Sequence, residues 1–550
     1  MADYYDLGEY ERAVSTDSVE AQAWFNRGLV WTYGYHHEEA VECYEKALQH
    51  DSDLALAYWG IAYAVGPNYN RQWDDFDDGE KSEYLGRALE AVASAQERAA
   101  TAEPVERALI EALAVRYPSD PSVDDFGPWN DAYAEAMRDV YRDNPNDMDV
   151  RALFAEAMMN RTPWQLWDLS TGGPAEGADT LEALEVLESA FADLADQGAN
   201  THPGLLHMYI HLVEMSPNPE KGLKAGDALV NLAPDAGHLQ HMATHIDVLC
   251  GHYQNVVARN DLAIVADSKY LAERGPQNFY TVYRCHNYHF KIYGAMFLGQ
   301  MGPAMYAAEE LAETLTDDVV RPLADWLEAF IPIKQHVLIR FGMWKDIKAQ
   351  ELPEDRELFS VTTALILYAK TVAYAATGDI PNATATRDEF RVAKTAVPES
   401  RMLFNNTCVD ILDIAEEMLE GELSYRLGDF DIAFAHLRRS VELDDTLPYD
   451  EPWGWMQPTR HALGALLLEQ GRYEEAEAVY RADLGLDNTL SRASQHPDNV
   501  WSLHGLHECL MMRGEVEEAR MVKQRLDMAN ARADVPIKAS CFCRLEHANV

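Results

Sequence analysis

The feature of this 550-residue sequence that most restricts its fold is a recurring spacing of small and large apolar residues. From Trp24 onward, Gly28, Ala40, Tyr44 and Ala47 follow at offsets of 4, 12, 4 and 3 residues. Two helices joined by a tight turn produce such a spacing, because small side chains let them approach while large ones fill the remaining space. The spacing predicts helical hairpins, and it recurs at Gly421, Ala433, Leu437 and Ser440, and at Gly464, Ala476 and Tyr480.

Glycine-containing turn signals separate the two helices of each C-terminal copy, at Gly428-Asp429 and at Gly471-Arg472. The segments YGYHHEEAVECYEKALQHDSDLALAYWGIA and LGALLLEQGRYEEAEAVYRADL resemble the tetratricopeptide repeat consensus. No segment shows the apolar alternation of a strand. The resemblance implies an all-α fold, a tetratricopeptide-like α-α superhelix in which helical hairpins stack as a solenoid. Weaker copies of the repeat cover residues 205–232, 237–266, 285–314 and 365–394.

Differences in the repeat pattern and in composition divide the chain into four predicted segments. Three stretches rich in Gly and Pro interrupt the helical pattern at 66–80, 116–128 and 162–178. Long inserts in a solenoid gather on one face, which is often the binding face. The predicted segments are 1–200 with N-terminal hairpins and loop inserts, 201–315 with His-rich central repeats, 316–532 with C-terminal repeats, and a tail at 533–550 that packs as a cap or stays loose.

Composition restricts the partners and the compartment. Acidic residues outnumber basic ones by 92 to 45, and the resulting net charge of −47 repels phosphate backbones and anionic membranes. We therefore expect no nucleic acid and no membrane as partners. Seven scattered cysteines do not suggest a disulfide framework, the first residues are acidic, and no apolar run approaches the ~18 residues of a membrane span. These features predict a cytoplasmic protein.

Histidines are concentrated in the middle of the chain, where eight of the 19 lie between residues 207 and 289. Spacings of 3, 4 and 7 residues put side chains on one face of a helix, so each cluster is predicted to point in one direction. The clusters are His207, His211 and Glu214, then His238, His241 and His245, and finally His286 and His289.

The repeat register aligns these clusters with one another. When Gly222, Val256 and Ala304 take the place of Ala40, the clustered residues fall at positions 2, 5, 9 and 12 of three successive first helices. In the tetratricopeptide fold these positions resemble those that line the concave groove. HPGLLHMYIHLVEMSPNPEK, PDAGHLQHMATHIDVLCGHY and RCHNYHFKIYGA also resemble a subfamily of long tetratricopeptide proteins with a His-rich centre. The eight side chains are therefore predicted to meet in one volume.

Such a ligand set favours transition metals. Imidazole is the usual ligand of copper, iron, zinc and nickel, whereas magnesium and calcium prefer oxygen. An i, i+4 pair such as His241 and His245 can chelate one ion from a single helix. We predict a mononuclear or dinuclear site with copper or iron, or alternatively zinc, held by His207, His211, Glu214, His238, His241, His245, His286 and His289.

Three functions are compatible with the predicted histidine site. The first is a metal-dependent oxidoreductase or oxygenase that acts on a small-molecule substrate at the concave face. The second is a zinc-dependent hydrolase that uses metal-bound hydroxide. The third is a non-catalytic scaffold that binds a protein or peptide in the groove, with the histidines as hydrogen-bonded groove residues. We favour an enzyme over the scaffold.

A few other residues are weaker candidates for ligands. Glu156 and Asn160 are spaced i, i+4, and His37 lies in the first hairpin. Each is more commonly a helix cap or a hydrogen-bonded core residue than a ligand. Cys541 and Cys543 have no second pair at zinc-finger spacing, so zinc is not predicted there.

Overall fold

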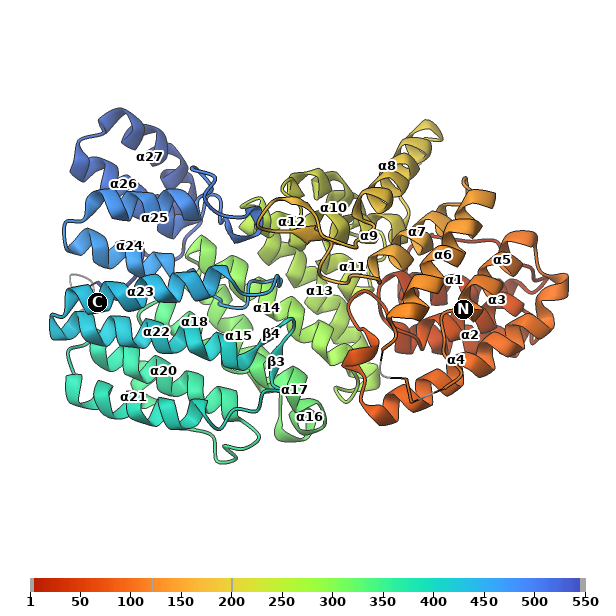
Figure 1. Cartoon of the computed structure of the whole chain (residues 1–550), viewed down its shortest axis with the longest axis horizontal. Coiled ribbons are helices and arrows are strands. Elements are labelled where there is room, and N and C mark those ends of the chain that lie inside the picture. The colour runs from red at the N-terminus through yellow and green to blue at the C-terminus, as the bar shows by residue number, and fades with distance from the viewer. Residues whose placement is uncertain (1–3, 121, 124, 199–200, 545–550) are drawn as a thin grey trace. The chain divides into compact units, whose positions relative to one another are not determined.

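The computed structural model describes residues 4–120, 122–123, 125–198 and 201–544, and they form helical hairpins with almost no sheet (Figure 1). This architecture confirms the predicted all-α tetratricopeptide superhelix. Contacts divide the chain into two compact units, Met1–Ile246 with Val265–Lys269 and Asp247–Ile264 with Tyr270–Val550. The four-segment division predicted from the sequence rests on a different criterion and stays a prediction.

Successive helices of the first unit from α1 to α10 pack side by side, and α9 also packs on α7 and α1. These helices are α1 (Val19–Tyr33), α2 (His37–His50), α3 (Ala55–Ala64), α4 (Asp78–Arg98), α5 (Pro104–Ala114), α6 (Gly127–Asp143), α7 (Met148–Met159), α8 (Thr180–Asp196), α9 (Pro203–Glu214), α10 (Leu223–Leu229), α11 (Gly237–His241) and the first part of α12 (Ala243–Leu249). The insert after α7 contains a two-residue ladder of β1 (Trp167–Asp168) and β2 (Gly173–Pro174).

The second unit continues the hairpin pattern, and Figure 1 shows pairs such as α22 and α23 lying alongside each other. Its elements are α13 (Tyr253–Arg274, except Val265–Lys269), α14 (Tyr280–Leu298), α15 (Met301–Thr314), α16 (Asp317–Val320), α17 (Ala324–Leu327), α18 (Ile333–Arg340), α19 (Trp344–Ala349), α20 (Ser360–Ala376), α21 (Ile380–Lys394), β3 (Met402–Leu403), β4 (Asn406–Thr407), α22 (Cys408–Leu427), α23 (Phe430–Asp445), α24 (Arg460–Glu469), α25 (Tyr473–Asp483), α26 (Val500–Arg513) and α27 (Val516–Asn530).

The small residues of the repeat pattern mark the places where helices approach most closely. A Cβ atom at Gly28 would lie 2.7 Å from the Tyr44 ring, and one at Gly464 would lie 2.5 Å from the Tyr480 ring. Both tyrosines are fully buried. The glycine and tyrosine therefore fit together as the spacing predicted, since any larger side chain would push the paired helices apart.

The C-terminal segment belongs to the second unit and packs against its helices over the described part, up to residue 544. The Asp534 carboxylate accepts hydrogen bonds from the backbone N–H groups of Met301 and Gly302. Cys541 and Cys543 form a disulfide, which the scattered cysteines had not suggested. The part of the predicted tail beyond residue 544 lies outside the described residues.

Candidate metal centre

Helix α9 carries the first cluster, and its N-terminal end is well defined. The His202 ring caps the helix by accepting a hydrogen bond at Nδ1 from the backbone N–H of Leu205, at 3.2 Å. Pro203 occupies the first turn, where its missing N–H costs nothing. From this start, His207 and His211 stand one turn apart on the same face of the helix.

Two short helices carry the second cluster. Helix α11 ends at His241, and α12 begins at Ala243. The backbone N–H of Met242 donates to His238 and that of His245 donates to Met242, so the chain turns continuously between the two helices. His238, His241 and His245 consequently lie on neighbouring turns of one helical path.

The first unit brings six of the eight predicted ligands together. Five of these six form two groups that share His211, and in each group the possible ligand atoms lie within 4.8 Å of one another. All six side chains are at most 1% exposed to solvent. The first group is His207, His211 and His238, the second is His211, Glu214 and His245, and His241 adjoins them with its Nε2 2.8 Å from Nε2 of His245.

Hydrogen bonds at Nδ1 fix the orientation of the rings. His207 Nδ1 donates to the backbone carbonyl of Tyr33 at 2.6 Å. His211 Nδ1 donates to Glu214 Oε1 at 3.0 Å, and His245 Nδ1 donates to Glu214 Oε2 at 2.8 Å. A neutral imidazole that donates from Nδ1 has its lone pair on Nε2. Glu214 thus lies behind two rings with both of its oxygens occupied, as carboxylates do beside metal-binding histidines.

Burial keeps the rings neutral. It lowers the pKa of His207 to about 3, and it lowers the pKa of His211 well below the usual range, with the charge of His207 adding to the effect. Within the described residues, no hydrogen-bond partner reaches Nε2 of either ring. Both nitrogens therefore offer a buried lone pair, which is the form in which histidine binds a metal ion.

Aromatic side chains cover the cluster. The ring of Tyr35 lies 4.6 Å from that of His207 and is stacked at 5.8 Å on that of His238. Tyr69 and Trp164, which come from two of the inserts predicted from the sequence, lie 4.9 and 5.7 Å from the ring of His211. The sequence predicted that these histidines line the concave groove and meet in one volume, but it did not predict that residues of two inserts cover them.

The remaining two predicted ligands belong to the second unit. His286 and His289 both lie in α14, with their rings 4.7 and 6.2 Å from that of Phe404. His289 Nε2 lies 2.8 Å from the sulfur of Met456, and burial lowers the pKa of His289 to about 3. That these two histidines share a site with the other six stays a prediction.

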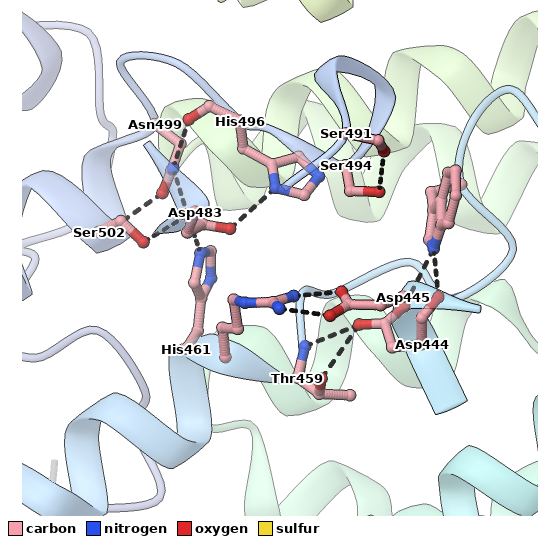
Figure 2. A network of polar contacts seen from close by, with 12 residues as sticks. Asp444, Asp445, Thr459, His461, Asp483, Ser491, Ser494, His496, Asn499 and Ser502 are labelled. Carbon is pink, nitrogen blue, oxygen red and sulfur yellow. Dashed lines mark hydrogen bonds and ion pairs between the residues drawn. The ribbon is translucent and has the colours of Figure 1, made fainter. Parts of the chain in front are cut away.

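The second unit contains a further, largely buried polar network that was not predicted from the sequence (Figure 2). The Asp483 carboxylate accepts hydrogen bonds from His496 Nδ1 at 2.8 Å and from His461 Nε2 at 2.9 Å. Asn499 and Ser502 donate to Asp483 Oδ2 at 2.9 and 2.5 Å. These four donors satisfy the carboxylate and hold its pKa well below its usual range against the effect of burial. The network is therefore closed.

Tetratricopeptide repeat family models match the chain at two places, residues 21–54 and 458–489. Together with the helical hairpins, these matches show that the chain is a tetratricopeptide repeat protein. The resemblance to a His-rich subfamily stays a prediction. A comparison with curated proteins gives no match. Among the described helices, none combines the length and the hydropathy that crossing a membrane requires.

Several solved structures are similar to this chain over most of its length. Yeast Tom70 is 13% identical, and the alignment covers 93% of this chain and 98% of the Tom70 chain, with a TM-score of 0.27. Cut9 in the APC/C hetero-tetramer Cut9-Hcn1 is 13% identical, covers 96% of both chains and has a TM-score of 0.24. A monomeric mutant of IFIT1 with Gppp-AAAA is 13% identical, and the alignment covers 93% of this chain and 91% of the IFIT1 chain, with a TM-score of 0.29. Because these TM-scores are low, we infer nothing about function from these structures.

Proposed function

We propose that this chain is a metal-binding tetratricopeptide scaffold, whose first unit encloses a transition metal ion among buried histidines and whose repeats bind protein partners. The observation that carries the metal is the set of Nδ1 hydrogen bonds from His207, His211 and His245, since they leave Nε2 of each ring as the donor atom. The matched repeats support the scaffold, because helical repeats of this kind present extended binding surfaces.

The dimensions of the cluster suit an ion after a small adjustment. Zn–N bonds of about 2.0–2.1 Å separate two ligands of a tetrahedral ion by about 3.4 Å. The ligand atoms of His207, His211 and His238 lie within 4.8 Å of one another, so the rings need to close by about an ångström. The 2.8 Å pair of His241 and His245 needs to open by about half an ångström.

The protonation of that pair also suits an ion. Because His245 donates from Nδ1 to Glu214, its Nε2 accepts, and His241 donates the proton between the two rings. An ion bound by both Nε2 atoms replaces this proton, so that binding releases it. Imidazole nitrogens suit copper, iron and zinc, and the ligand set does not by itself select one of them.

The buried position of the ligands favours a structural ion over a catalytic one. Structural sites have all of their positions filled by protein, whereas catalytic sites keep one open for substrate or water. All six side chains are at most 1% exposed, which is typical of the closed kind. Glu214 takes the supporting position in this arrangement, where it holds the rings of His211 and His245.

The second candidate function is an oxidoreductase with a copper or iron centre. It is favoured by the number of imidazoles, since five in one unit exceed the need of a single closed site. The phenol of Tyr35 beside His207 supplies a polar wall for a small substrate. A zinc hydrolase would use the same ligands with a bound hydroxide.

Cobalt substitution tests both the site and its openness. We expect Co(II) to bind the full chain with the visible absorption of a tetrahedral nitrogen site, and His207→Ala with His211→Ala to abolish that absorption. Added azide should leave the spectrum of a closed site unchanged and should shift that of an open, catalytic site. Parent protein that gives no cobalt spectrum at pH 7.5 would contradict the proposal.

A further inference from the structure

A second group of buried polar side chains lies in the first unit, on the helices before α9. Tyr63 is on α3, Arg116 follows α5, Tyr133 is on α6, and Glu156 is on α7, with Asn160 at its C-terminal end. Each is at most 3% exposed. The sequence had marked Glu156 and Asn160 only as weak candidates, because nothing in it showed which residues surround them.

Contacts join these five residues into one buried polar group, which we call the chamber. The guanidinium of Arg116 lies 5.2 Å from the ring centre of Tyr63 and 4.9 Å from that of Tyr133. The hydroxyl of Tyr63 donates to Glu156 Oε2 at 2.5 Å. Glu156 and Asn160 are i, i+4 neighbours on one face of α7.

Six polar atoms of this chamber have no hydrogen-bond partner among the described residues. They are buried, and such atoms cost free energy unless a water or a ligand satisfies them. Atoms of this kind are satisfied by water or by a ligand. The atoms are Nε and Nη1 of Arg116, Oε1 of Glu156, Oδ1 and Nδ2 of Asn160, and the hydroxyl of Tyr133. Glu156 also interacts with the side chains of Asn160 and Tyr35, which lower its pKa.

The charge in the chamber indicates the kind of occupant. Arg116 is 0% exposed, and it donates a hydrogen bond to the carbonyl of Pro67 at 2.8 Å. Its charge interacts with Glu156, but burial still leaves the pKa of that carboxyl above its usual range. A buried guanidinium whose neighbouring carboxyl is partly neutralised is costly, and water relieves that cost less than an anion does.

We propose that the chamber binds a small carboxylate that also carries a hydrogen-bond donor, namely a hydroxy acid or an amino acid. Arg116, Asn160 and Tyr133 supply donors to the carboxylate. Glu156 Oε1 and Asn160 Oδ1 accept from the hydroxyl or amino group. None of these five residues is a proposed metal ligand, although Tyr35, whose ring contacts His207, also interacts with Glu156.

Titration with small acids tests the proposal on the full chain, with a chelator present throughout so that no metal contributes. The probes are glycolate, glycine and acetate, each compared with sodium chloride at equal ionic strength. We expect glycolate or glycine to bind saturably by calorimetry and to raise the melting temperature. Acetate should bind more weakly because it lacks the donor, and ethylene glycol should not bind because it lacks the carboxylate.

Two conservative variants locate the binding. Asn160→Asp keeps the shape but adds a negative charge, and Tyr133→Phe removes one hydroxyl. We expect the affinity to fall at least about tenfold in the first and about threefold to tenfold in the second, since a hydrogen bond to a charged group contributes about 1.5 kcal/mol or more. The matched controls are Asn26→Asp, whose side-chain oxygen accepts from Gln22, and Tyr209→Phe, whose hydroxyl donates to Glu188. Both should bind like the parent.

The possible outcomes decide the proposal. An acid that copurifies with the chain and appears in the mass spectrum after denaturation supports it. If none copurifies and no probe binds more than chloride does, the chamber contains water only and the proposal is wrong. Binding that persists unchanged in both Asn160→Asp and Tyr133→Phe places the acid elsewhere and also overturns it. Tyr133→Phe keeps the test valid if Asn160→Asp fails to fold.

Discussion

The two units each bury histidines beside a carboxylate, but they use the ring nitrogens differently. In the second unit, His461 donates from Nε2 to Asp483 and accepts at Nδ1 from Arg340, at 3.0 Å. His496 likewise donates from Nδ1 to Asp483, and its Nε2 contacts the hydroxyl of Tyr293 at 3.1 Å. All four nitrogens of these two rings are therefore occupied by protein.

In the first unit, His207 and His211 leave half of this capacity unused among the described residues. His207 and His211 each form a hydrogen bond through Nδ1 and have no partner for Nε2 among the described residues. Burial makes an unused nitrogen costly, so a fold that retains two of them in one place gains from a bound ligand. Both sets of histidines are buried, so under the proposed function the pairing of ring nitrogens, and not burial, separates the structural histidines of the second unit from the proposed metal ligands of the first.

The largest expected effect comes from breaking the closed network of the second unit. Asp483→Asn keeps the shape but removes the charge that accepts from two histidines, one amide and one hydroxyl. Removing one partner of a buried ionic network costs about 3–5 kcal/mol. We expect urea unfolding to show a loss of this size, and the same loss with and without chelator. A variant as stable as the parent would show that the network is not needed.

Removing the ion should destabilise the first unit by a smaller amount. An ion at a hundredfold excess over its dissociation constant stabilises the folded state by about 2.7 kcal/mol. We expect a chelator at pH 7.5 to lower the melting temperature of the parent but not that of His207→Ala with His211→Ala. Asp483→Asn is the control, and it should respond to the chelator as the parent does. An equal response of the double variant would place the ion elsewhere.

Glu214→Gln should weaken the site without unfolding it. The amide can still accept from one of the two rings of His211 and His245, but it lacks the charge that orients both. Loss of such a supporting carboxylate lowers metal affinity about 10-fold to 100-fold. Competition with a coloured chelator measures the change, and Glu188→Gln, which contacts Tyr209, is the matched control. Tighter binding by Glu214→Gln would argue against the supporting role.

The pH dependence of the metal-free chain gives the smallest effect per residue. His207 has a pKa of about 3 in the folded state, whereas an unfolded histidine titrates near ~6.5. Its contribution to stability is present above pH ~6.5 and is lost as the pH falls toward 3, because the unfolded chain then takes up the proton. Each such histidine adds up to about 1.4 kcal/mol per pH unit to the slope. His207→Gln should flatten the urea-unfolding slope between pH 6.5 and 4.5, and an unchanged slope would contradict the assigned pKa.

Sequence reasoning succeeded where the relevant pattern is local. The fit of Gly28 against Tyr44 follows from a spacing within one hairpin, and the shared face of His207 and His211 follows from the turn of one helix. These local rules were enough to predict the superhelix and to bring six candidate residues to one place.

The rest depends on contacts between distant segments. Tyr35 contacts His207, and Tyr69 contacts His211, across more than a hundred residues of sequence, so no periodicity could predict that the site is buried. The hydrogen bonds of Glu214 to His211 and His245 could not be predicted from its spacing, because they depend on where α12 lies. That Glu214 is itself a metal ligand stays a prediction. Arg116 gave no signal, since its surroundings are visible only in three dimensions.

The metal content of the protein purified without a His-tag tests the central claim most directly. We expect about one equivalent or more of copper, iron or zinc, either as isolated or after reconstitution and desalting, since ligands this well ordered bind their ion tightly. His207→Ala with His211→Ala should retain almost none, while Asp483→Asn that remains folded should retain the parental amount. Parent protein that is folded yet holds none of these ions after exposure to each of them would contradict the account.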